Sequence, residues 1–179
     1  AIGRAPAVVA LAPWIVFVVA LAVYANSLAN GFVIDDGGII VRNGVVHGWD
    51  GIWRAFTVPY WPTGEGQYRP LVIASFAAEW RAWADNPIGY HAVNVLWHGA
   101  ASVLVYVLAR RWLSFGGSAI AALLFAVHPV HVEAVANVVG RAELMAACGV
   151  LGMLLLHARR SPWAIVAFAG GLFSKEHAI

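Results

Sequence analysis

The stretch HAVNVLWHGAASVLVYVLA, residues 91–109, is continuous apolar sequence without Asp, Glu, Lys or Arg. About 20 such residues in an α-helix cross the roughly 30 Å of hydrocarbon in a bilayer. The chain as a whole is also poor in charge: only 11% of all residues are charged, against about 25% in soluble domains. Strands of a membrane barrel would alternate apolar and polar residues. The sequence therefore predicts an all-α membrane protein.

Four further runs are apolar enough to predict membrane spans: residues 7–28, 112–130, 135–156 and 162–174. Residues 71–84 are apolar but shorter and contain Glu79 and Arg81, which predicts a helix that lies in the interface or enters only partway. Basic residues mark cytoplasmic loops. If residues 71–84 do not cross, Arg4 and the pairs 110–111 and 159–160 share one side, which predicts a multi-pass protein with a cytoplasmic N-terminus.

This topology collects most other ionisable side chains on the outer side, which is periplasmic in a bacterium. They are Asp35, Asp36, Tyr68, Arg69, His91, His128, His131, Glu133, Arg141, Glu143, Lys175, Glu176 and His177. Charged groups at the end of a membrane helix are costly unless they face a cavity or one another. We therefore expect one polar pocket that opens to the outside.

Residues 30–67 form an outer loop that is longer than the usual limit of about 12–15 residues for a plain connection, which indicates a functional loop. Within it, residues 50–56 read as an amphipathic helix with Asp50 as its N-cap. Trp53 and Phe56 suit a position in the membrane interface. The sequence thus predicts an interfacial helix in the first outer loop.

Two adjacent carboxylates, Asp35 and Asp36, follow the first apolar run. One interpretation is a solvated loop end or the cap of a short helix that begins at Gly37. The other is catalytic: one carboxylate acts as a general base and its neighbour binds substrate or metal. An apolar lip raises the pKa of a carboxyl group by desolvation, which makes it a better base.

The tripeptide Tyr68-Arg69-Pro70 predicts a helix that begins at Pro70, with the cation Arg69 just before it. Proline disfavours helix at the preceding residue and is favoured at the first helical position. The guanidinium of Arg69 beside free N–H groups suits a phosphate, and the alternative is a headgroup anchor. Ser174-Lys175-Glu176-His177 ends the fifth run on the same side.

The segment HPVHVEAVANVVGRAE, residues 128–143, carries a third group of polar residues. Pro129 breaks the incoming span, and a new helix is expected to begin there. On that helix Glu133, Asn137 and Arg141 have i, i+4, i+8 spacing and would form one polar stripe, with Glu143 on its other flank. Such a stripe should face protein or water.

Histidines in this region have two interpretations. His128, His131 and Glu133 could hold a divalent metal, but their spacing matches no zinc signature, and hydrogen-bonded structural histidines are the alternative. His91, Asn94 and His98 lie on one face of the span over residues 91–109, which favours interhelical hydrogen bonds.

The ordered series YANSLANGFVIDD, YRPL, GYHAVNVLWH, HPVHVEAVANVVGRAE and FSKEHAI resembles the transmembrane and tetratricopeptide-repeat O-mannosyltransferases and their bacterial relatives. More distantly the chain is similar to the protein O-mannosyltransferases and the GT-C glycosyltransferase superfamily. The resemblance implies that residues 1–179 are the N-terminal part of a GT-C type helical module. Further spans and tetratricopeptide repeats are then expected beyond residue 179, with only the front of the active site supplied here.

The resemblance also implies a sugar donor carried on a polyisoprenyl phosphate and an acceptor hydroxyl on a protein Ser or Thr. Asp35 matches the acidic residue of the family's first loop, the base, and Asp36 is its neighbour. Distant relatives have HPPL where this chain has YRPL, so the role of Arg69 carries over less directly. His131, Glu133, Arg141 and Glu143 lie on the family's HP-x-H-x-E and GRAE strings.

The resulting hypothesis is transfer of a mannose-like sugar at the outer face with inversion. Asp35 would be the base, with Arg69 or Arg141 stabilising the phosphate. Two other classes stay open: a fragment of a proton-coupled transporter, and a membrane-anchored tetratricopeptide-repeat scaffold. Nucleic acid is not an expected partner, because the arginines form no basic face, and the lone Cys148 permits no disulfide within the chain.

Overall fold

The computed structural model describes residues 7–64 and 66–176 of the chain. Within these two ranges the secondary structure is entirely helical, which confirms the predicted all-α class. The long helices are α1 (Ala7–Val23), α4 (Pro70–Trp83), α5 (Pro87–Ala109), α6 (Phe115–Val127), α8 (Arg141–His157) and α9 (Trp163–Leu172). Shorter turns are η1 (Ala25–Ala29), η2 (Gly37–Val41), α2 (Gly44–His47), α3 (Gly51–Arg54), η3 (Pro129–His131), α7 (Val132–Ala136) and η4 (Val138–Gly140).

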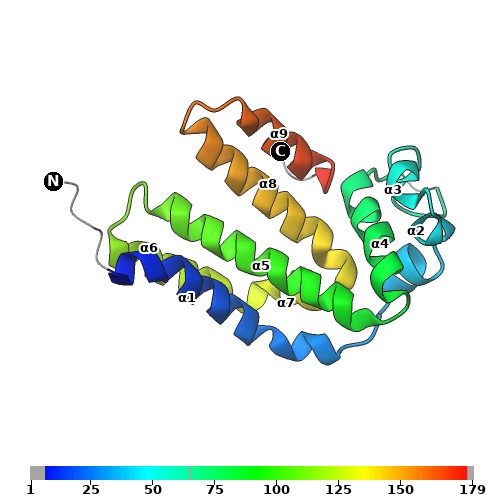
Figure 1. Cartoon of the computed structure of the whole chain (residues 1–179), viewed down its shortest axis with the longest axis horizontal. Helices are drawn as coiled ribbons and strands as arrows, with labels where there is room; N and C mark the ends of the chain where they lie inside the picture. The colour runs from blue at the N-terminus through cyan, green and yellow to red at the C-terminus, as the bar shows by residue number, and fades with distance from the viewer. Residues whose placement is uncertain (1–6, 65, 177–179) are drawn as a thin grey trace.

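Five of the long helices form an elongated bundle (Figure 1). Helix α5 is its centre and packs against α1, α6 and α8, while α9 packs against α8. Local sequence explains where the central helices begin: Asn86 caps α5 through a bond from the Ile88 N–H at 3.1 Å, and Ser114 caps α6 through the Gly117 N–H at 3.2 Å. Side-chain caps of this kind satisfy N–H groups that have no partner within the helix.

Membrane-crossing capacity is established for part of the bundle. Among the described residues, Pro87–Ala109 and Val138–His157 are each long and apolar enough to span a bilayer, and a third span results if Phe115–Val127 and Pro129–Ala136, bent by 44°, are counted together. Leu11–Val23 and Trp163–Leu172 are shorter apolar helices. Five crossings and their orientation therefore stay predictions.

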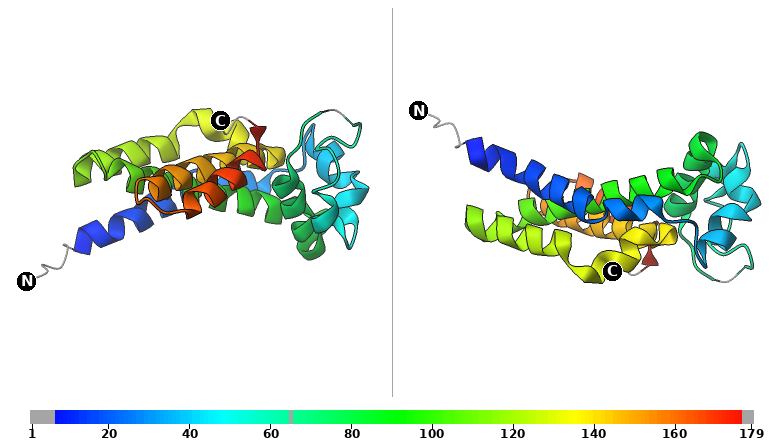
Figure 2. Two further views of the ribbon diagram at one scale, coloured as in Figure 1. Left: turned by 90° about the horizontal axis from the view of Figure 1, so that it is seen from above. Right: turned by 90° about the horizontal axis from the view of Figure 1, so that it is seen from below.

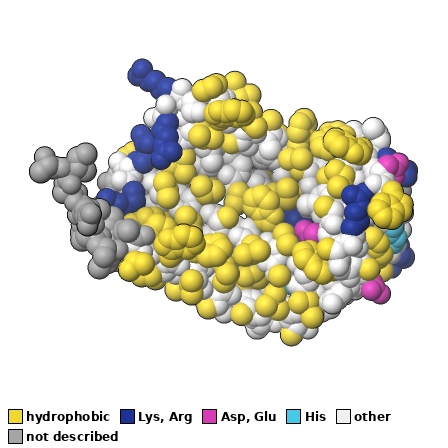
Figure 3. Space-filling model, in the orientation of Figure 1, with side chains coloured by type: hydrophobic (Ala, Val, Ile, Leu, Met, Phe, Trp, Pro, Cys, Tyr) yellow, Lys and Arg dark blue, Asp and Glu magenta, His cyan; other side chains and the backbone are white. Residues whose placement is uncertain are grey.

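The charged residues of the bundle separate toward its two ends (Figure 3). The pairs 110–111 and 159–160 follow α5 and α8 at the end where α1 begins, while the loop helices α2 and α3 gather at the opposite end (Figures 1 and 2). Hydrophobic side chains cover most of the face between them. Arg4 lies outside the described residues.

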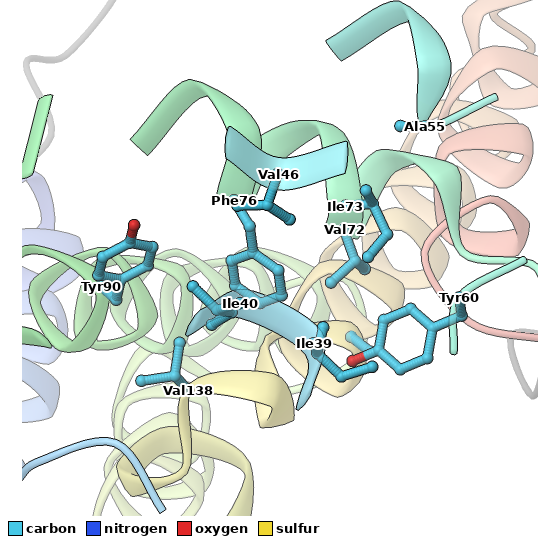
Figure 4. Packing of buried hydrophobic residues seen from close by; sticks show 11 residues of the cluster. Ile39, Ile40, Val46, Ala55, Tyr60, Val72, Ile73, Phe76, Tyr90 and Val138 are labelled. Carbon is cyan, nitrogen blue, oxygen red and sulfur yellow. The ribbon is translucent and has the colours of Figure 1, made fainter. Parts of the chain in front are cut away.

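The long loop predicted over residues 30–67 is folded and shares a buried core with α4. Ile39 and Ile40 of η2 and Tyr60 pack against Val72 and Phe76 of α4, all of them buried (Figure 4). Helix α4 lies at the same end of the bundle as this loop (Figure 1), and Pro70 occupies its first turn as predicted. This core fixes the loop and the start of α4 relative to each other.

The helix expected at residues 50–56 is reduced to the single turn α3. Asp50 stands at its N-cap position but makes no side-chain capping bond. Its carboxylate lies 3.9 Å from the guanidinium of Arg54 instead, with both side chains at least half exposed. A position of α3 in the membrane interface stays a prediction.

The continuous helix expected from Pro129 through residue 156 is wrong. Pro129 ends α6 as predicted, but η3, α7 and η4 follow, and α8 begins only at Arg141. Asn137 has extended backbone (φ −95°, ψ 127°) between α7 and η4. Asn94 of α5 stabilises this break, since its amide donates to the carbonyls of Asn137 at 2.9 Å and Val138 at 3.1 Å.

Candidate functional site

One polar pocket of about 440 Å³ opens at the loop end of the bundle. It is lined by Asp35, Arg69, Val130, His131, Glu133, Ala134, Asn137, Val139, Gly140, Ala142, Glu143 and Lys175. Segments far apart in sequence meet here, namely the first loop, the start of α4, the broken turns after α6 and the end of α9. The structure thus brings together five of the eight residues predicted for the site: Asp35, Arg69, His131, Glu133 and Glu143.

Asp35 enters the pocket from a strained turn. The preceding residue, Ile34, has φ +38° and is 90% exposed, a conformation that is rare for a β-branched side chain. Asp35 is half-buried, and within residues 7–64 and 66–176 its carboxylate has no hydrogen-bond or ion-pair partner. A carboxylate with both oxygens uncommitted can accept a proton or a hydroxyl hydrogen bond from a ligand.

Asp36, the second predicted catalytic carboxylate, is not a pocket residue. It is fully buried, and its two oxygens accept hydrogen bonds from the N–H groups of Val33 and Val139, both at 2.9 Å. Burial raises the pKa of Asp36, although the two N–H donors partly offset this effect. Asp36 therefore joins the first loop to η4 and holds the turn that carries Asp35, and it does not line the pocket.

Arg69 is the more firmly held of the two pocket cations. Its Nε and Nη2 donate to the two carboxylate oxygens of Glu176 at 3.0 and 2.7 Å, and the guanidinium lies 4.8 Å from the ring centre of Tyr60. Burial opposes the charged form of Arg69, but the hydrogen bonds and charge of Glu176 outweigh it and raise the pKa. A bidentate geometry of this kind also suits phosphate.

Lys175, the only lysine in the sequence, is the second cation. Its ammonium donates to the carboxylate of Glu143 in the first turn of α8. The sequence grouped Lys175 with the other residues of this end of the molecule but assigned it no part in the site. The available signal was the SKEH cluster at the end of an apolar run, and His177 of that cluster lies outside the described residues.

Arg141 is not a pocket residue, which corrects the predicted polar stripe. It is completely buried and donates to Asn94 Oδ1 at 2.8 Å, Tyr90 O at 2.9 Å and the carboxylate of Glu79. The stripe fails because the helix is broken at Asn137, so helical spacing no longer relates Glu133, which lines the pocket, to Arg141, which is buried in the interior. Arg141 connects α4, α5 and α8, and no pocket cation is supplied by it.

Two further predictions have different outcomes. The hydroxyl of Tyr68 donates to the carbonyl of Phe56 at 2.9 Å, so Tyr68 stabilises the loop and does not line the pocket. The hydrogen bonds predicted from α5 to other segments are confirmed for Asn94 and His98. The amide of Asn94 donates to the carbonyl of Asn137, and Nε2 of His98 lies 2.9 Å from the carbonyl oxygen of Ala126 in α6. Asn94 thus holds the turns that form the pocket wall, whereas His98 joins α5 to α6.

A metal site built from His128, His131 and Glu133 is not supported. Nδ1 of His128 accepts the N–H of Val130 at 3.2 Å, which caps η3. Across the part of the chain that the structure describes, no group of three or more His, Cys, Asp and Glu side chains is placed to hold a metal ion.

The fold and the pocket define an all-helical protein with membrane-compatible helices and a charged pocket at one end. Comparison with known proteins gives the family. The chain is 42% identical over 132 residues to protein O-mannosyl-transferase Tmtc1 of Drosophila melanogaster, covering 70% of this chain and 15% of that protein. It is 37% identical over 147 residues to human protein O-mannosyl-transferase TMTC3, covering 79% and 16%.

A Caenorhabditis elegans protein O-mannosyl-transferase, F38B6.6, is 35% identical over 146 residues, covering 76% of this chain and 21% of that protein. This chain therefore belongs to the TMTC family of protein O-mannosyl-transferases, as the motif series predicted. It spans about a fifth or less of the length of these relatives. No family model and no solved structure matches it.

Proposed function

We propose that this chain forms the front of a glycosyltransferase site that moves a mannose-like sugar from a polyisoprenyl phosphate to a hydroxyl group, such as that of a protein Ser or Thr. The observation that carries the proposal is the pocket in which the uncommitted carboxylate of Asp35 shares a wall with the cations Arg69 and Lys175. The names of the relatives support a mannosyl transfer to protein.

In this mechanism Asp35 accepts the proton of the acceptor hydroxyl. The acceptor oxygen forms a bond to the anomeric carbon as the bond from that carbon to the phosphate oxygen breaks, with inversion. The electron pair of the broken bond leaves with the lipid phosphate, whose negative charge Arg69 stabilises. A phosphate is already a good leaving group, so the step requires no strong general acid.

The remaining polar side chains of the pocket are assigned to substrate binding. Glu133 is exposed, and His131 is half-buried beside it in the pocket lining, so both can accept hydrogen bonds from sugar or acceptor hydroxyls. Glu143 contributes through Lys175. Arg141, Asp36 and Tyr68 act by holding these residues in place.

We place the pocket on the extracytoplasmic side. The arginine pairs 110–111 and 159–160 lie at the other end of the bundle, and basic residues favour the cytoplasmic side. A pocket at the ends of apolar helices lets a lipid-linked donor react without leaving the bilayer. This position, a GT-C type fold and further spans beyond the described region are all part of the proposal.

The test is Asp35→Asn in the full-length protein with a labelled polyprenyl-phosphate sugar donor. Loss of a general base lowers rates by about 10²- to 10⁴-fold, and we expect that loss with insertion and folding unchanged. Asp85→Asn is the matched control, because Asp85 is an exposed carboxylate outside the pocket. Transfer by Asp35→Asn at the rate of the control would exclude Asp35 as the base.

A further inference from the structure

The two cations of the pocket are both paired with carboxylates that point toward solvent. Arg69 is 11% exposed and its partner Glu176 is 43% exposed, while Lys175 is 14% exposed and Glu143 is 51% exposed. The cations therefore lie deeper than their partners, and Glu143 lines the pocket beside them. We propose that Lys175 is a second phosphate-binding residue and that Glu143 and Glu176 are placeholders that an incoming phosphate displaces, an inference that rests on the proposed function.

The two cations are held in a fixed relation although they are far apart in sequence. The N–H of Leu71, at the start of α4, donates to the carbonyl of Phe173, at the end of α9, at 3.2 Å. The ring of Tyr68 also meets the ring of Phe173 edge-on at 6.3 Å. Arg69 is two residues before Leu71 and directly follows Tyr68, and Lys175 is two residues after Phe173, so this one joint positions both charges.

An exchange of partners is favourable on general electrostatic grounds. Ion pairs with an exposed partner add little net stability, because water competes for both charges. A phosphate carries more acceptor oxygens than a carboxylate and bonds an arginine in the same bidentate way. The guanidinium then supplies geometry, while the lysine ammonium supplies a compact point charge.

The carboxylates of the pocket repel an anion, so the proposal also predicts how removing one of them changes phosphate binding. Asp35 and Glu133 also line the pocket, and Glu143 holds the Lys175 ammonium directly. Removing the charge of Glu143 should therefore release Lys175 and tighten phosphate binding. A lysine that only stabilises the end of α9 through Glu143 would show no such effect.

The position of Lys175 favours a phosphate attached to a lipid. Apolar helix α9 ends at Leu172, so the ammonium lies just beyond the end of a hydrophobic segment. Lysine at such a place reaches the level of lipid headgroups. A free phosphate shares the same chemistry, and the two sources are separated by experiment.

The experiment measures binding of polyprenyl phosphate without a sugar to the full-length protein in nanodiscs. We expect Lys175→Gln to weaken binding by about 10- to 100-fold, the range for one hydrogen bond to a charged group, and Lys175→Arg to remain within about threefold of wild type. Glu143→Gln should bind more tightly. Arg110→Gln is the matched control, since Arg110 is exposed and lies at the far end of α5.

Two additional probes identify the source of the phosphate. Inorganic phosphate that binds in a Lys175-dependent way shows a site for the anion itself, whereas binding of the polyprenyl phosphate alone shows a lipid-linked ligand. The affinity for polyprenol, which has no phosphate, should be the same in Lys175→Gln and in wild type. Equal affinity of Lys175→Gln and wild type for polyprenyl phosphate overturns the proposal.

A measurement on the unsubstituted protein covers the case in which Lys175→Gln does not fold. Polyprenyl phosphate should slow acetylation of Lys175, read from the peptide that contains it, and unchanged acetylation overturns the proposal. Lys175-dependent binding without sugar transfer supports this site and removes the transferase proposal. Normal transfer with an unchanged donor KM in Lys175→Gln supports the transferase proposal and excludes Lys175 as a phosphate-binding residue.

Discussion

Replacement of Arg141 by methionine tests whether this residue is structural or binds the donor. The side chain is completely buried and donates to Glu79, Asn94 and the carbonyl of Tyr90. Methionine fills a similar volume without a charge. The change leaves the carboxylate of Glu79, itself 10% exposed, without its cation inside the bundle.

The expected cost follows from these contacts. Removing one partner of a buried ion pair costs about 3–5 kcal/mol, because the other charge is left uncompensated. The orphaned carbonyl of Tyr90 belongs to the same network, so its loss is included in that range and not added to it. Since about 1.4 kcal/mol changes an equilibrium constant tenfold, the ratio of folded to unfolded protein should fall more than hundredfold.

Replacing both partners by apolar residues is the diagnostic control. Apolar replacement of a whole buried pair is often neutral or stabilising, so Arg141→Met with Glu79→Leu should recover most of the loss. Unfolding in detergent, followed by tryptophan fluorescence, measures both variants beside Arg110→Met, an exposed arginine. If Arg141→Met costs under about 1 kcal/mol and instead weakens polyprenyl-phosphate binding, Arg141 is a donor ligand and the structural assignment is refuted.

The other predictions concern the carboxylate behind Asp35 and the α8–α9 contact. Burial raises the pKa of Asp36 above its ordinary value of 3.8, so its contribution to stability falls as pH rises from that value through the raised pKa. The difference in unfolding free energy between wild type and Asp36→Asn should therefore be larger at pH 4 than at pH 7, and a pH-independent difference would contradict the burial argument. A Cβ on Gly149 would lie 2.6 Å from the backbone of Gly171, so Gly149→Ala should separate α8 from α9 and cost about 1–3 kcal/mol. Gly152→Ala, whose Cβ would have an ordinary 3.8 Å contact, should instead be neutral or stabilising, and equal effects of the two would refute the close-packing argument.

The pattern of apolar runs determined the helical class and the ends of several helices. Pro70 and Pro129 marked a helix start and a helix end correctly, because proline restricts its own backbone and that of its neighbour regardless of context. The order of the motifs was enough to identify the family. The gathering of Asp35, Arg69 and Glu133 at one end also followed from sequence, because membrane helices place their polar ends at only two levels.

The roles of individual charges could not be read in this way. Asp35 and Asp36 are adjacent and chemically identical, yet one lies in the pocket and the other is clasped by the N–H groups of Val33 and Val139. Helical spacing placed Arg141 on the stripe with Glu133, and the break at Asn137 moved it into the interior. That break depends on Asn94, a residue on another helix that supplies hydrogen bonds to the freed carbonyls.

The sequence by itself determined the helical class, the family and the grouping of Asp35, Arg69 and Glu133 at one end, because apolar runs, prolines and motif order can be read without knowing which distant segments meet. Only the tertiary structure decided which carboxylate is uncommitted, which arginine is buried and that Lys175 faces Arg69's pocket. Those assignments depend on hydrogen-bond and ion-pair partners more than 30 residues away in sequence, such as Glu143 for Lys175 and Glu176 for Arg69. No local pattern encodes which distant partner satisfies a given charge.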